Sequence, residues 1–166
     1  YNQAMAAKQR HVGFLMILMQ RLVTSSTAAI RATLEKRQAA LENPPAQMDL
    51  APVDIAEWAE LDGQAQADVA FDAAGWALEK GEVETLLDLA RETEATGTDA
   101  KAEALVELVY KLQQEENDPT LKVLVFTEFV PTQAMLAAFL ESRGFSVVTL
   151  NGGMDLDART RAQRAF

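Results

Sequence analysis

Two short polar segments near the C-terminal end of the chain have the residue types that could contact a ligand. Each follows an apolar run, and they are Thr127-Glu128-Phe129 and Asn151-Gly152-Gly153. Glycine lets backbone N–H groups approach a ligand closely. A Gly-Gly pair between a strand and a helix is also an ordinary tight turn. The residue types alone therefore favour a turn, with ligand binding through backbone groups as the alternative.

The remaining polar residues do not assemble a catalytic or metal site. The chain has no Cys and a single His, His11, so we expect neither a standard zinc site nor a nucleophile with an attendant base. Asp155 and Asp157 stand at the predicted start of a helix, where capping and the helix dipole explain them without a metal. The sequence also contains no G-x-x-x-x-G-K-[ST] loop and no D-E-x-H segment. We expect no catalytic residue and no metal ligand in this chain.

A predicted β-α-β unit positions the two polar segments. Residues 121–126 and 145–150 are apolar runs, typical of strands buried on both faces of a parallel sheet. Pro131 suits the start of a helix between them and Gly144 suits a left-handed helix end. A right-handed crossover makes such strands parallel, so we expect both polar segments at the carboxyl edge of one sheet.

The same region resembles the start of the second RecA-like lobe of superfamily-two helicases, specifically Swi/Snf-type DNA translocases of bacterial type. The family reads roughly V-L-I-F-S-Q-F where residues 123–129 read VLVFTEF. A later family segment, L-D-G-S-T-S-x-x-x-R-x-x-x-x-x-x-F, matches Leu150, Gly152, Arg159 and Phe166 without a gap. The departures from the family pattern include Glu128 for Gln, Asn151 for Asp and Gly153-Met154 for Ser-Thr.

Two further stretches resemble the family in the expected order. Residues 21–30 are similar to an R-L-x-S-S-x-x-A stretch that leads into the second lobe, although their serines and threonines could simply cap a new helix. Residues 98–108 are similar to S-x-K-x-x-x-L-x-x-L, the helix before the first strand of that lobe. Asp99 can cap this helix, and its predicted apolar stripe consists of Leu105, Leu108, Val109 and Leu112.

The resemblance implies a fold and a role. The fold class expected is α/β, a mostly helical fragment with a truncated parallel RecA-like sheet of two strands. In the family these segments run along one nucleic-acid strand, which implies contacts from Thr127, Glu128, Phe129, Asn151, Gly152 and Gly153. Arg159 would brace the second segment or meet a phosphate. ATP and Mg would bind elsewhere in the intact parent, an ATP-dependent helicase or translocase that acts on DNA, and this fragment alone is not expected to be active or to hold a cofactor.

Charge divides the chain into three parts. The net charge is −10, but residues 1–41 carry six Lys or Arg and one Glu, whereas residues 42–99 carry two basic and fifteen acidic residues. The middle would repel a phosphate backbone, while either end could still meet one. We expect a helical lead-in at 1–41, an acidic helical insertion at 42–97, and the incomplete second lobe at 98–166.

The acidic middle supports an alternative function. Trp58, Trp76 and further apolar residues within 53–95 lack basic neighbours, which favours protein contact over stacking on bases. The alternative is therefore a non-enzymatic, α-rich interaction module whose acidic segment binds a partner protein. Val12–Met19 is too short to span a bilayer, so we expect no membrane contact and a cytoplasmic location. Because two strands alone are marginally stable, the fragment could also self-associate.

Overall fold

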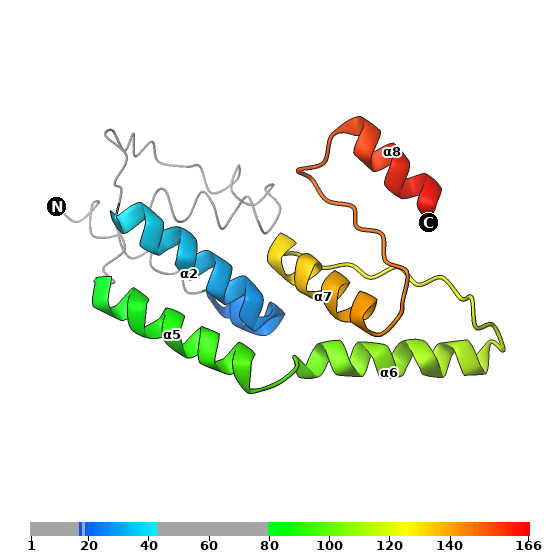
Figure 1. Cartoon of the computed structure of the whole chain (residues 1–166), viewed down its shortest axis with the longest axis horizontal. Helices are drawn as coiled ribbons and strands as arrows, with labels where there is room; N and C mark the ends of the chain where they lie inside the picture. Colours follow the sequence, from blue (N-terminus) through cyan, green and yellow to red (C-terminus); the bar gives the residue numbers. More distant parts are fainter. Residues whose placement is uncertain (1–16, 18, 43–79) are drawn as a thin grey trace. The chain divides into compact units, whose positions relative to one another are not determined.

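The computed structural model describes residue 17 and residues 19–42 and 80–166. Their elements are α2 (Thr27–Glu42), α5 (Lys80–Thr96), α6 (Ala100–Glu115), α7 (Val130–Ser142) and α8 (Leu156–Ala165) (Figure 1). They belong to two compact units, Tyr1–Thr96 and Gly97–Phe166. The predictions for His11 and for the helices of 53–79, with Trp58 and Trp76, lie outside the described residues.

In the first unit, α2 and α5 lie side by side (Figure 1). Leu34, Val83 and Leu87 form their buried core, with Ile30 and Leu41 packed against it. Arg31, near the start of α2, donates to Glu94, near the end of α5, at 2.6 Å. The two helices are therefore antiparallel.

Ser26 separates α2 from the helical residues 19–25. Its backbone N–H bonds the Leu22 carbonyl at 3.2 Å, and its buried hydroxyl accepts from the Ala29 N–H at 3.1 Å. This is an N-cap, in which a side-chain oxygen satisfies a free donor of the first turn. The serine-threonine stretch thus caps a new helix, as its residue types predicted.

In the second unit, α6 begins where the sequence placed its cap. The Asp99 carboxylate accepts from the N–H groups of Lys101 and Ala102. The buried face is rotated from the predicted stripe, because Ala102, Val106 and Val109 are buried while Leu108 is 50% exposed. The small side chain of Ala102 is fully enclosed at the start of this face.

α7 also follows its local signals. Pro131 lies in its first turn, where a missing N–H costs nothing. Gly144 has a φ of 86° just beyond its end, so the left-handed glycine expected there is confirmed. Arg143, at the C-cap, donates to Glu103 of α6 at 2.7 Å and lies over the Phe139 ring at 3.5 Å.

The predicted two-stranded parallel sheet is wrong. Residues 121–126 and 145–150 are coil, and the described part of the chain contains helices and no strand. Among the described residues, the backbone groups of 122–126 and 146–149 form no backbone hydrogen bonds with one another. A strand needs a partner for its backbone groups, and a two-stranded sheet is marginal by itself. The fold class is therefore helical, and the RecA-like α/β prediction is corrected.

Candidate functional site

The first polar segment leads directly into α7. Thr127 is half-buried and Glu128 is exposed. Phe129 is 1% exposed and occupies the N-cap position of α7, with φ −111° and ψ 130°. Its side chain is thus a core group, unavailable for stacking on a base. A ligand contact from Phe129 would have to come from its backbone.

The second polar segment is a turn with a bonded interior. Asn151 Oδ1 accepts from the Gly153 N–H at 3.1 Å, and the Asn151 carbonyl accepts from the Met154 N–H at 3.3 Å. Gly152 and Gly153 are exposed. The two glycines of the turn are therefore exposed, while the side chain and the carbonyl of Asn151 form the hydrogen bonds within the turn.

Arg159 holds this turn from α8. Its Nε donates to the Met154 carbonyl at 2.9 Å, and its Nη2 donates to the Gly152 carbonyl at 2.8 Å. Asp155 caps α8 by accepting from the Ala158 N–H at 2.7 Å, which places Arg159 one turn into the helix. Arg159 thus braces the turn through these two hydrogen bonds. A guanidinium carries five N–H donors, so three remain beyond these two bonds.

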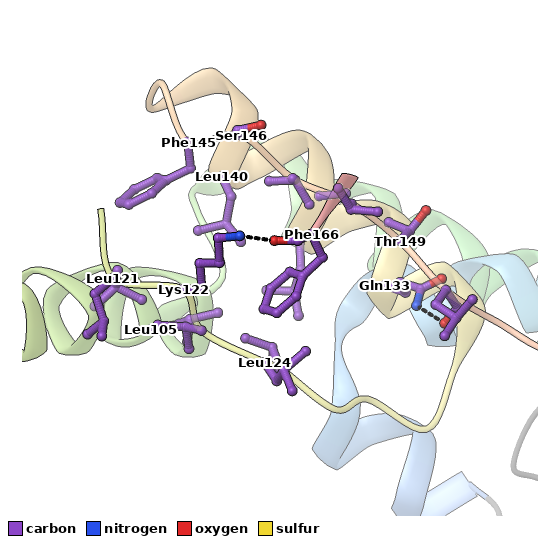
Figure 2. A pocket seen from close by; sticks show the side chains of 18 of the residues that line it. Leu105, Leu121, Lys122, Leu124, Gln133, Leu140, Phe145, Ser146, Thr149 and Phe166 are labelled. Atoms are coloured by element: carbon purple, nitrogen blue, oxygen red, sulfur yellow. Dashed lines mark hydrogen bonds between the residues drawn. The ribbon is translucent and has the colours of Figure 1, made fainter. Parts of the chain in front are cut away.

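Gln133 of α7 also bonds this turn, and the sequence did not indicate it. Its Nε2 donates to the Leu150 carbonyl at 2.9 Å, and its Oε1 accepts from Asn151 Nδ2 at 2.9 Å; the first of these bonds is dashed in Figure 2. Gln133 is the fourth residue of α7, and its N–H donates to the Phe129 carbonyl at 3.0 Å. Phe129 and Asn151 are therefore both bonded to one residue. The predicted proximity of the two segments arises without a sheet.

One cavity lies beside these segments (Figure 2). Its volume is about 590 Å³. Its walls are largely apolar and come from α6, α7, Phe166 and both segments that were predicted as strands. Lys122 lies over the Phe166 ring at 5.4 Å and its ammonium donates to the Phe166 carbonyl. The cavity is thus lined by both of the segments that were predicted to pair as strands.

Charge near the turn is mixed. Arg161 and Arg164 on α8 are exposed, as are Asp155 and Asp157 at the start of the same helix. No group of three or more His, Cys, Asp or Glu that could hold a metal ion occurs among the residues whose placement is described. The chemistry offered here is hydrogen bonding from a turn and from arginines. No nucleophile or acid-base pair is formed by the residues of this turn.

Comparison with known proteins gives one informative similarity. A stretch of 66 residues, 40% of this chain, is 41% identical to the ATP-dependent helicase rhp16 of Schizosaccharomyces pombe. The similar protein is a helicase. The match covers 7% of that helicase, so the similarity concerns a part of it. No family model and no solved structure matches the chain. A helicase-related part is the level of relationship that these comparisons support.

None of the described helices is both long and apolar enough to cross a membrane.

Proposed function

We propose that this chain is part of an ATP-dependent DNA helicase or translocase and contributes contacts to one nucleic-acid strand. The observation that carries the proposal is the 41% identity over 66 residues to an ATP-dependent helicase. The resemblance of residues 123–129 and 150–166 to Swi/Snf-type motifs supports the finer assignment to the second motor lobe. ATP and Mg would be bound by the rest of the protein, and this chain alone would not hydrolyse ATP.

The geometry that supports strand contact is the turn at Asn151-Gly152-Gly153. Its glycines are exposed, while its carbonyls at Gly152 and Met154 are bonded inward to Arg159. Turning carbonyls away from a phosphate removes an electrostatic repulsion, and glycine lets the strand come close. Thr127 and Glu128 would add contacts from the first segment, and Phe129 would contribute through its backbone.

Gly153→Ala tests the close approach without disturbing the turn. A Cβ built on Gly153 comes within 3.5 Å of Asn151 Oδ1, which is ordinary van der Waals contact. The turn should therefore persist while a methyl group keeps the strand away. Loss of one backbone hydrogen bond should weaken DNA binding by about two- to tenfold, measured as fluorescence polarisation of a labelled single-stranded DNA at low salt.

The matched control is Gly97→Ala, because a Cβ there meets nothing within 4 Å. It should bind DNA like the wild type. Absence of DNA binding by the wild-type chain, together with absence of DNA-stimulated ATP hydrolysis in the longer protein, would overturn the proposal. Equal affinity of the Gly153→Ala and Gly97→Ala variants would remove the turn from the interface.

The second candidate is the protein-interaction module. It is favoured by α5, where Leu86 and Leu89 are 37% and 58% exposed among acidic residues. An apolar stripe flanked by carboxylates suits a protein partner and repels phosphate. This candidate predicts no DNA-dependent polarisation change, even in the longer protein, so the same measurement separates the two functions.

A further inference from the structure

We infer that Gln133 is a positioning residue, which ties the turn at residues 150–153 to the start of α7 and so sets where the two polar segments meet a nucleic-acid strand. The inference concerns a residue outside the resembling motifs. Its second half, the contact with nucleic acid, rests on the proposed function. Its first half, the ordering of the turn, does not.

The side-chain amide of Gln133 uses both of its ends. Its NH₂ group donates to the Leu150 carbonyl and its oxygen accepts from the Asn151 amide, each at 2.9 Å. An amide can donate and accept at once, and no charged side chain can do both. Asn151 in turn restrains the backbone of Gly153, because the Asn151 side-chain oxygen accepts from the Gly153 N–H at 3.1 Å.

The turn is consequently held by two helices of the same unit. Gln133 bonds its first half from α7, while Arg159 bonds Gly152 and Met154 from α8. Residues 146–149 before the turn form no backbone hydrogen bonds with other described residues. Side-chain bonds therefore supply much of the order that a sheet would otherwise provide.

Gln133 also links the turn to the first polar segment, through its backbone. Its N–H donates to the Phe129 carbonyl at 3.0 Å, and the Phe129 side chain is 1% exposed. The buried ring fixes that end of the first segment, since moving it would open the core. Gln133 thus bonds Phe129 through its backbone, in the first turn of α7, and bonds Leu150 and Asn151 through its side chain.

The test compares Gln133→Leu and Gln133→Glu with the wild-type chain by ¹H–¹⁵N spectra and by DNA polarisation. Leucine has a similar size and can form neither bond. Glutamate can still accept from Asn151, but its carboxylate faces the Leu150 carbonyl without a donor. We expect both variants to shift or broaden the amide resonances of Gly152 and Gly153, and DNA affinity to fall about two- to tenfold.

Gln114→Leu is the control, because Gln114 is an exposed glutamine on α6 whose side chain has no described bond in this structure. It should leave the turn resonances and the affinity unchanged. The urea midpoints of all variants are compared, so that a general loss of fold is distinguished from a local change at the turn.

Unchanged Gly152 and Gly153 resonances in both Gln133 variants would overturn the inference. Shifted resonances with undiminished DNA affinity would overturn its second half, the link to binding. If the wild-type chain and the longer protein both fail to bind DNA, the proposed function falls. The spectra then still decide whether Gln133 orders the turn.

Discussion

At the scale of single residues, the candidate site depends on side chains that bond the backbone of a turn. Arg159 donates to two carbonyls and Gln133 bonds a carbonyl and an amide. The resemblance of residues 150–166 to the helicase motif placed Arg159 in the site. Gln133 was not indicated by the sequence, because a helical glutamine belongs to no pattern of charge or hydrophobicity. Phe129 was expected to contact a ligand, yet its ring is buried.

Arg159→Lys distinguishes bracing from a simple charge effect. Lysine keeps the positive charge, but a single ammonium cannot reproduce the fork that reaches the Met154 and Gly152 carbonyls. We expect the variant to lose roughly threefold to tenfold in DNA affinity, consistent with the loss of about one hydrogen bond. Fluorescence polarisation measures the loss, with Arg161→Lys as the control on the exposed side of α8. Full affinity in Arg159→Lys would show that charge alone matters at this position.

At the scale of elements, signals that act within a few residues predicted the helices well. Asp99 and Asp155 cap α6 and α8, and Gly144 ends α7 with a left-handed backbone. These features depend on neighbours in sequence, so a pattern reveals them. The sheet was wrong because a strand depends on a distant partner, and apolar runs such as residues 121–126 do not state where that partner lies. The two polar segments come together instead through Gln133, for which no sheet is needed.

Leu87→Ala tests the antiparallel pair of α2 and α5. Leu87 is 1% exposed and belongs to the core with Leu34 and Val83. Its truncation should reduce the free energy of unfolding by about 2–5 kcal/mol, through lost burial and the cavity left behind. Urea denaturation followed by circular dichroism measures this change. Leu89→Ala, at a position 58% exposed on the same helix, should change it by less than about 0.5 kcal/mol.

At the scale of the whole molecule, the described residues include both packed helices and coil. Each of the two units has buried helical residues, and the coil of the second unit has exposed apolar side chains. Leu124 is 67% exposed and Phe126 is 91% exposed. Large exposed hydrophobic groups beside a cavity are unfavourable in water. The resemblance to a helicase lobe did not reveal this arrangement, because motifs report short stretches of sequence and not how they pack.

Hydrogen exchange tests this difference between helix and coil. The amides of residues 122–126 and 146–149, which have no backbone partners among the described residues, should exchange at the shortest labelling times. Amides in the middle of α6 should be protected, because exchange there requires opening of helical hydrogen bonds. Mass spectrometry of peptides from the labelled chain measures both. Protection of residues 122–126 equal to that of α6 would contradict the unpaired coil.

The buried ring of Phe129 has a mechanical consequence. Since it anchors the start of α7 in the core, the preceding segment cannot be displaced at that end unless the helix travels with it. The Asn151 turn, fastened to the same helix through Gln133, would be carried along. The first polar segment, α7 and the turn would then move together as one rigid unit, so that a displacement of any of the three displaces the other two.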